Sequence, residues 1–156
     1  MTMRKEVKME QKQTIRVYKA DSQGKDEGTP FVGNIPAGFA SPAADYLNEA
    51  IDLNQLVIRN KDYTFIGRVE GTSMIDASLN DGDIVVIDRS LEPKDRDKVL
   101  VCVDGEFTIK HIVVDKERQK VWLVPANADF PKIEVKKESD LKIWGVVTYS
   151  ITKHRV

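Results

Sequence analysis

The pattern of hydrophobic and polar positions separates the first thirty residues from the rest of the chain. Residues 1–13 are mostly polar or charged, and such a composition is typical of a disordered segment. Residues 14–19 alternate apolar and polar side chains, which predicts a short strand if an edge is there to pair with. Residues 20–30 contain turn-forming and charged residues without periodicity, so we expect a flexible linker.

A short helical region is predicted next. Ser41 and Pro42 form a helix start, with the serine as N-cap and the proline at the first helical position. We expect an amphipathic helix from there to Ala50, and then a second helical turn that Asp52 caps. The apolar face of that turn consists of Leu53, Leu56 and Val57.

From Asp62 onward, apolar residues recur in short runs that are separated by turn-forming residues. The runs predict strands at Tyr63–Val69, Ile84–Asp88, Lys98–Val103, Phe107–Val114, Val121–Pro125 and Ile143–Ile151. Strands at this spacing favour a curled antiparallel or mixed sheet. We therefore expect a mainly β domain, preceded by a short N-terminal helix and a flexible N-terminal arm.

Composition narrows the class of protein. The 156 residues are 41% hydrophobic and 31% charged, which suits one soluble globular domain with an added arm. A net charge of -1 gives the whole chain no strong attraction to nucleic acid. The single cysteine, Cys102, excludes an internal disulfide and fits a reducing compartment, so we expect a cytoplasmic protein. The sequence has no apolar run that predicts a membrane span and no zinc-ligand spacing, and we expect neither metal nor cofactor.

Within Gly71–Asp83, one serine, Ser73, lies on a predicted bend before an apolar strand. A serine hydroxyl needs a base to become a nucleophile, and no motif of a triad hydrolase surrounds Ser73. His111 adjoins Lys110 on a strand and points to the opposite face, and His154 lies in a basic tail. Lysine can act as the base when burial brings its pKa towards neutrality. Lys110 is the best candidate because strand-forming apolar residues flank it, although a solvent-facing strand residue is the reading that the residues alone favour.

Residues 31–39 combine apolar side chains with glycine and proline, which prevents regular secondary structure. Pro36 pushes the preceding residue towards an extended conformation. The small residues Ala37 and Gly38 would let the backbone approach a nucleophile without a side-chain clash, as a protease cleft requires. A linker that packs an aromatic residue at each end is the alternative, and composition favours it.

Three stretches in this order resemble the LexA/UmuD family of serine–lysine self-cleaving peptidases: Gly71–Met74, Asn80–Asp88 and Val103–Lys110. The UmuD branch is matched more closely, through residues 38–46, 51–56, 73–76 and 144–147. The resemblance covers about residues 36–150 and implies the curled β-rich fold shared by LexA, UmuD and signal peptidase. It also implies that residues 1–37 are an arm removed by self-cleavage and that residues 38–156 form the peptidase domain.

The resemblance assigns a role to each matched position. Ser73 is the nucleophile, Lys110 is the general base, and the bond between Ala37 and Gly38 is the one cut. Backbone N–H groups would stabilise the oxyanion at Thr72, Ser73 and Met74. The family further implies a homodimer, stimulation of cleavage by a RecA–single-stranded-DNA filament in the SOS response, and a product that joins a UmuC-type translesion polymerase as an accessory subunit.

Other classes of protein stay open at this point. A non-catalytic β-rich interaction module would use Ser73 and Lys110 only as structural residues. A LexA-like or phage-type regulator without its DNA-binding domain is a further alternative, because residues 1–37 lack the helical periodicity of a helix-turn-helix unit. We expect no direct sequence-specific DNA binding. Signal peptidase shares the chemistry, but it needs a membrane anchor that the sequence does not predict.

Overall fold

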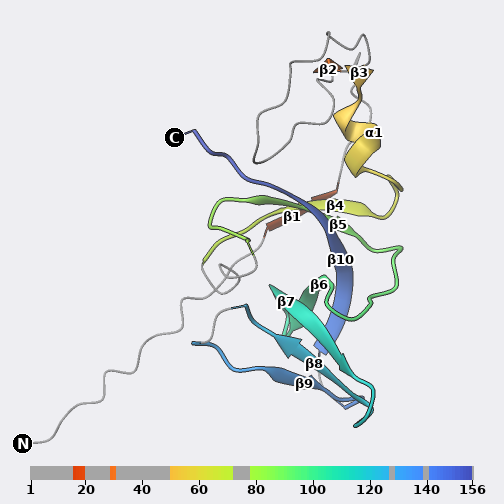
Figure 1. Ribbon diagram of the computed structural model, residues 1–156, viewed down its shortest axis with the longest axis vertical. Coiled ribbons are helices and arrows are strands. Elements are labelled where there is room, and N and C mark those ends of the chain that lie inside the picture. Colours follow the sequence, from red (N-terminus) through yellow and green to blue (C-terminus); the bar gives the residue numbers. More distant parts are fainter. Residues whose placement is uncertain are drawn as a thin grey trace, which may run out of the picture.

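The computed structural model describes residues 16–19, 29–30, 50–71, 78–126, 129–138 and 141–155 (Figure 1). These residues form an eight-stranded antiparallel sheet in the order β1-β4-β5-β10-β6-β7-β8-β9, and a second sheet of β2 and β3. The mainly β fold is therefore confirmed. The strands are Arg16–Lys19 (β1), Thr29–Pro30 (β2), Ala50–Ile51 (β3), Thr64–Arg68 (β4), Ile84–Asp88 (β5), Lys98–Val103 (β6), Glu106–Asp115 (β7), Lys120–Val124 (β8), Ile133–Val135 (β9) and Leu141–Ile151 (β10), and the helix is Leu53–Val57 (α1).

The central strand β10 joins two parts of the large sheet. Its first half pairs with β6 and its second half with β5, and the register shifts once in each half. Such irregularities bend a strand and increase its twist. Figure 1 shows β10 as a long curved strand that runs from the β4–β5 part of the sheet to the β6–β9 part. The sheet is thus curled, as the turn spacing predicted.

Both faces of the curled sheet bury apolar side chains. One core, here called the Ile109 cluster, contains Val69, Leu79, Val85, Ile87, Leu100 and Ile109. The other, the Ile112 cluster, contains Val99, Val101, Ile112, Leu123 and Val146. Consecutive residues of β6 belong alternately to the two clusters, because successive side chains of a strand point to opposite faces. This explains the unbroken apolar run of β6, which is typical of a strand covered on both sides.

Trp144 packs at the border of the Ile109 cluster. Its ring lies edge-to-face with Phe65 at 4.7 Å and with Phe107 at 5.4 Å between centroids. The Arg89 guanidinium lies 4.1 Å from the Trp144 ring centroid, and Arg89 Nε donates a hydrogen bond of 3.0 Å to the Trp144 carbonyl. This tryptophan is therefore a packing residue that ties β10 to β4, β7 and the residues after β5.

The short elements near the N-terminal side match the predictions in part. Asp52 caps α1, since its Oδ1 accepts N–H groups from Asn54 at 2.9 Å and Gln55 at 3.3 Å. The N-terminal strand is confirmed as β1, which pairs with β4. The prediction that the helix extends to Ala50 is wrong at that residue. Ala50 lies in β3 and pairs with Pro30 of β2, and this cross-strand pairing overrides the local helical pattern. Residues 41–49 of that predicted helix lie outside the described residues.

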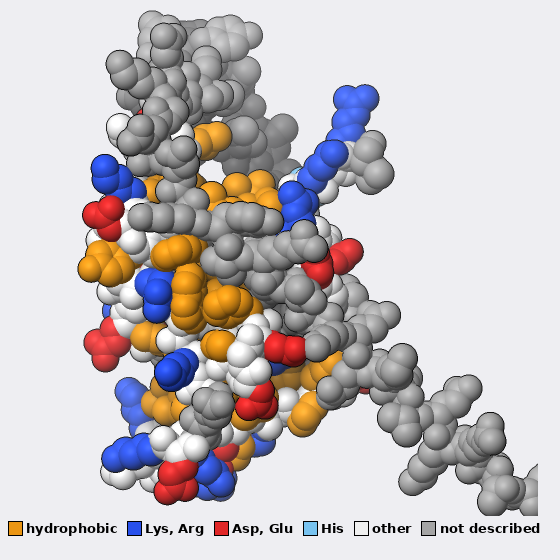
Figure 2. All heavy atoms as spheres, turned by 180° about the vertical axis from the view of Figure 1, so that it is seen from behind, with side chains coloured by type: hydrophobic (Ala, Val, Ile, Leu, Met, Phe, Trp, Pro, Cys, Tyr) orange, Lys and Arg blue, Asp and Glu red, His pale blue; other side chains and the backbone are white. Residues whose placement is uncertain are grey.

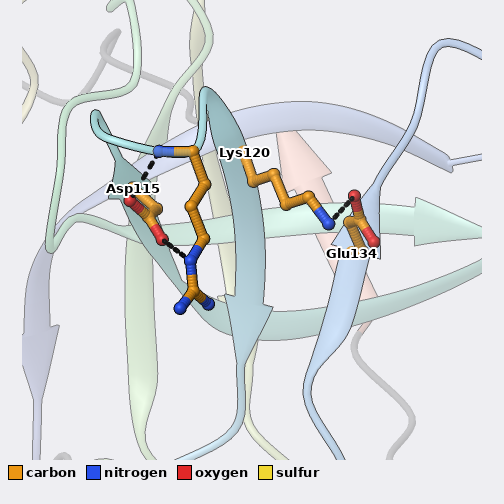
Figure 3. A network of polar contacts seen from close by, with 4 residues as sticks. Asp115, Lys120 and Glu134 are labelled. Atoms are coloured by element: carbon orange, nitrogen blue, oxygen red, sulfur yellow. Dashed lines mark hydrogen bonds and ion pairs between the residues drawn. The ribbon is translucent and has the colours of Figure 1, made fainter.

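The β7–β8 hairpin turns where the sequence predicts it. The Asp115 carboxylate accepts the backbone N–H of Arg118 at 3.1 Å, and Gln119 adopts a positive φ of 52°. Figure 3 shows this turn together with Lys120, whose Nζ lies 3.5 Å from Oε1 of Glu134 on β9. Exposed ion pairs of this kind contribute little free energy, so packing of the Ile112 cluster holds these strands together.

Candidate active site

Lys110 lies in the middle of β7 and is only 8% exposed. Its cross-strand neighbour on β6 is Val99, which is fully buried and belongs to the Ile112 cluster. Ile109 and Ile112 of the same strand are also buried. The interpretation of Lys110 as a solvent-facing strand residue is therefore wrong. Burial in apolar surroundings is the setting in which a lysine can work as a base.

The two sides of β7 separate Lys110 from His111. His111 pairs with Lys98 on β6 and with Val124 on β8, whereas Lys110 pairs with Val99. Because directly opposite residues of antiparallel strands share a face, the imidazole points away from the side of the sheet that carries Lys110. His111 is thus not positioned to assist a nucleophile on that side.

The segment that carries Ser73 is anchored at its start. Gly71 has a φ of +96°, a conformation that favours glycine, and its N–H donates a 3.0 Å hydrogen bond to Oδ1 of Asp81. Just before it, the Val69 N–H donates to the Asp83 carbonyl at 2.8 Å, and the Gly82 N–H donates to the Val69 carbonyl at 2.7 Å. The chain therefore enters residues 72–77 from a fixed position next to β5.

The same segment is also anchored at its end. Leu79 is 1% exposed and belongs to the Ile109 cluster, and Ser78 before it has a φ of 62°. The buried Asp83 carboxylate accepts the Asn80 N–H at 2.9 Å, and the Asp83 N–H donates to the Asn80 carbonyl at 3.1 Å. The predicted turn before Ile84 is thereby confirmed, with Gly82 at a φ of 88°.

Several residues of the predicted site lie outside the described residues. These are Ser73, its neighbours Thr72 and Met74, and the predicted cleavage position at Ala37 and Gly38. Their roles stay predictions. The structure does pair the residues on either side of the cleavage segment, since β2 pairs with β3 and residues 31–49 lie between them in the chain. Figure 1 shows β2 and β3 beside α1, at the opposite end of the molecule from β8 and β9.

Three residues near the site were missed by the sequence analysis. Asp81 gave no signal of its own, because its bond to Gly71 spans ten residues and leaves no local pattern. Val99 gave no signal within the continuous apolar run of β6. Phe130 has its ring centroid 5.9 Å from Lys110 Nζ, although it comes from the connection between β8 and β9. The strand pattern that marked Lys110 does not extend to that connection.

Other kinds of site find little support in the described part of the chain. It holds no cluster of three or more His, Cys, Asp or Glu side chains suited to a metal ion. No helix within it has the length and apolar character needed to cross a bilayer. Figure 2 shows acidic and basic side chains interspersed on the face it presents, without a continuous basic stripe of the kind that binds nucleic acid.

Comparison with known proteins assigns the chain to a family. The model of the family "Peptidase S24-like" matches residues 30–148. Protein MucA of Salmonella typhimurium is 34% identical over 144 residues, which are 91% of this chain and 97% of MucA. Protein SamA of Salmonella typhimurium is 40% identical over 125 residues, or 80% of this chain and 85% of SamA. The LexA repressor of Ectopseudomonas mendocina is 33% identical over 131 residues, covering 83% of this chain and 62% of the repressor. The chain thus belongs to the Peptidase S24-like family, which confirms the resemblance to the LexA/UmuD peptidases.

Proposed function

We propose that this protein is a self-cleaving serine peptidase of the SOS DNA-damage response. It cuts its own bond between Ala37 and Gly38, using Ser73 as nucleophile and Lys110 as general base. The observation that carries the proposal is the burial of Lys110, which is 8% exposed on β7 within the matched family region. An ordinary surface strand would leave a lysine in water, where its amine stays protonated at neutral pH.

In the first chemical step, neutral Lys110 takes the proton from Ser73 as the serine oxygen attacks the carbonyl carbon of Ala37. Negative charge then develops on the carbonyl oxygen. Backbone N–H groups at Thr72, Ser73 and Met74 stabilise this oxyanion. The bonds that hold Gly71 and Asn80 support this assignment, because donors must be fixed before the charge develops.

In the second step, the tetrahedral intermediate collapses and the bond between Ala37 and Gly38 breaks. Protonated Lys110 gives its proton to the nitrogen of Gly38, which leaves as the new N-terminus of the product. Water then attacks the ester between Ser73 and Ala37, again with Lys110 as base, and releases residues 1–37. Because the substrate is part of the same protein, its effective concentration is high and modest chemical power is sufficient.

The match to MucA, which spans almost the whole of that relative, supports the proposal of a UmuD-like protein. The chain aligns with 97% of MucA and with 62% of the LexA repressor. By the family resemblance, we propose that a RecA–single-stranded-DNA filament stimulates the cleavage. The product from Gly38 onward then serves a UmuC-type error-prone translesion polymerase as an accessory subunit, and the protein works as a cytoplasmic homodimer.

Mass spectrometry of the purified protein tests the cleavage. We expect fragments that correspond to residues 1–37 and 38–156, with no fragments from the Ser73→Ala or Lys110→Arg variants. Arginine keeps its charge at all accessible pH values and cannot serve as the base. The matched control is Lys142→Arg, an exposed lysine on β10, which should cleave like the unaltered protein. Cleavage that persists in Lys110→Arg would exclude this mechanism.

The pH dependence provides a second check. Because only the neutral amine accepts a proton, the rate of cleavage rises with pH, by about tenfold per pH unit below the pKa of Lys110, and levels off above it. The fraction cleaved is measured at fixed times between neutral and alkaline pH. A rate that does not change with pH would contradict a lysine base.

The biological role has its own experiment. The protein is incubated with RecA, single-stranded DNA and nucleotide, and each component is left out in turn. We expect faster cleavage only in the complete mixture, at the same bond. If the protein stays intact in the complete mixture and at every pH, it is a non-catalytic interaction module.

A further inference from the structure

Phe130 lies against Lys110 although the two residues come from different parts of the fold. The centroid of the Phe130 ring is 5.9 Å from Lys110 Nζ. Lys110 is in the middle of β7, and Phe130 belongs to the connection between β8 and β9, where it is half-buried. A half-buried aromatic ring thus lies near the amine of a buried lysine.

The strand register explains why this connection passes Lys110. The pairing of β7 with β8 ends at His111 and Val124, one residue from Lys110. The chain leaves the ladder there through the buried Pro125 and returns at Ile133, which pairs with Leu123. Pro131 restricts the residue before it to extended conformations, and this limits the freedom of Phe130. The fold therefore holds the ring near the amine.

An aromatic ring has two opposite effects on a nearby amine. Its face attracts a cation, and this attraction reaches to about 6 Å from the centroid. It also excludes water, which disfavours the charged form. The distance of 5.9 Å lies at the limit of the first effect. The second effect adds to burial that is already extensive, because Lys110 is 8% exposed and its neighbour Val99 is fully buried.

We propose that Phe130 is a positioning residue of the serine–lysine site, whose ring covers Lys110 and keeps water from its amine. This inference rests on the proposed function, since it gives Phe130 a part in keeping the base neutral. Phe130 does not react itself. It acts through Lys110, and its removal should therefore change the pH at which cleavage becomes fast rather than the rate that is reached when Lys110 is fully neutral.

Carboxylates around Lys110 act in the opposite sense, because negative charge favours the protonated amine. On the same side of the sheet, strand alternation and pairing place Glu106 on β7, Asp97 before β6 and Asp88 on β5. Asp129 precedes Phe130 in the connection. Within the same row of paired residues, Asp88 lies three strands away from Lys110 and also accepts hydrogen bonds from Ser90. With the ring removed, water and these carboxylates both favour the charged lysine.

The first experiment compares the pH profile of self-cleavage in the full chain and in Phe130→Ala. We expect the midpoint of the rise to move to higher pH by about 0.5–1 pH unit. Below both midpoints the variant then cleaves roughly three to ten times more slowly, and above both the two rates converge. Slower cleavage by the same factor at every pH would show a merely structural role and overturn the proposal.

The second experiment measures the pKa of Lys110 directly and does not depend on cleavage. The pKa of Lys110 is measured from its ¹³Cε resonance in Ser73→Ala and in Ser73→Ala/Phe130→Ala, with Lys110→Arg to assign the signal. We expect the pKa to rise in the double variant by about the same 0.5–1 unit. An unchanged or lower pKa overturns the role of Phe130. If the pKa of Lys110 rises in the double variant but the unaltered chain does not cleave itself, only the proposed function is overturned.

Two further variants separate the contributions. Phe130→Leu keeps an apolar cover and removes the aromatic face, so its midpoint should stay close to that of the full chain. A midpoint at lower pH in this variant would show that attraction of the cation governs, against the proposal. Lys132→Ala is the matched control from the same connection, because its Nζ lies 4.3 Å from the ring centroid of Trp122 instead. Its pH profile should be unchanged.

Discussion

The Asp81 carboxylate fixes the position of Gly71, the residue just before the segment that carries Ser73. The N–H of Gly71 donates to Asp81 at 3.0 Å, across a turn that is itself exposed. The bond ties the start of residues 72–77 to the turn before β5, where Asp83 and Leu79 are buried. The position of the proposed oxyanion donors therefore depends strongly on Asp81. The stability of the protein depends on Asp81 much less.

The Asp81→Ala variant should separate these two effects. The free energy of unfolding should fall by about 1 kcal/mol or less, because one exposed hydrogen bond contributes no more. Self-cleavage at fixed pH should slow by about tenfold or more, since misplaced oxyanion donors cost far more than a lost surface bond. Cleavage half-life and urea denaturation measure the two quantities.

The matched control is Asp115→Ala, which also removes a carboxylate that accepts a backbone N–H in an exposed turn, here that of Arg118. It should lose similar stability and cleave normally. Equal cleavage rates in both variants would show that the anchor at Gly71 has no part in catalysis.

At the scale of single residues, the sequence indicated that Lys110 could act as a base, but it did not indicate which residues surround it. Its apolar flanks were visible, yet the residues alone favoured a solvent-facing side chain. The reason is that the sheet has cores on both faces, so neighbouring Ile109 and Lys110 are both buried and simple alternation fails. Phe130 reaches Lys110 from a connection that has no period at all.

At the scale of elements, β10 determines the curl of the sheet. Its register shifts beside Gly145, and a Cβ atom added there would lie 2.6 Å from Cγ2 of Ile87 on β5. That distance is far inside van der Waals contact, so a larger residue fits only if the Ile87 side chain or the backbone beside it shifts. The close approach of β10 and β5 therefore depends on one residue without a side chain.

The Gly145→Ala variant should consequently lose about 1–3 kcal/mol of unfolding free energy, the usual cost of overpacking a core. Urea denaturation measures the loss. Ile87→Ala alone also destabilises by leaving a cavity, but in the double variant the added methyl group occupies part of that space. The double variant should therefore be more stable than the sum of the two losses predicts. Strict additivity would mean that the two residues do not meet.

Strand β1 covers an edge that would otherwise be open. It belongs to the arm that we propose is removed, and it pairs with β4 from Arg16 opposite Arg68 to Lys19 opposite Phe65. Proline has no N–H and breaks a strand ladder, so Val17→Pro should detach β1 from β4. In a Ser73→Ala background, hydrogen exchange should become at least about tenfold faster for the β4 amides that face β1. Amides of β6 and β7 serve as the internal control, and unchanged exchange in β4 would show that β1 does not protect it.

The elements differ in how far sequence could predict them. Seven strands and the Asp52 cap were recognised, because six strands have runs of apolar residues with turns at their ends, β1 alternates apolar and polar residues, and α1 has a capping side chain. Strand β9 has three residues and β2 and β3 have two each, which is too short for any period to show. Ala50 joins β3 because Pro30 is opposite it, and that partner is twenty residues away in the chain.

At the scale of the whole molecule, both cores lie on one side of the proposed cleavage position. Every buried residue of the Ile109 and Ile112 clusters lies between Val69 and Val146. The arm contributes β1 to an edge of the large sheet and β2 to the small one. Cleavage would then remove an edge strand, while all buried residues of the two clusters stay in the product from Gly38 onward.

We therefore expect residues 38–156, expressed alone, to fold cooperatively and to bury Lys110 as the full chain does. Loss of the β1 pairing should lower the free energy of unfolding by about 1–3 kcal/mol, the sum expected for a few cross-strand pairs at an edge. Urea denaturation of this fragment is compared with that of the Ser73→Ala full chain, which should not cut itself during the measurement. The comparison does not depend on catalysis. It therefore tests whether the folded domain begins after residue 37 independently of the cleavage mechanism. A fragment without a cooperative transition would mean that the arm is part of the folded domain, and that its removal could not yield a stable polymerase subunit.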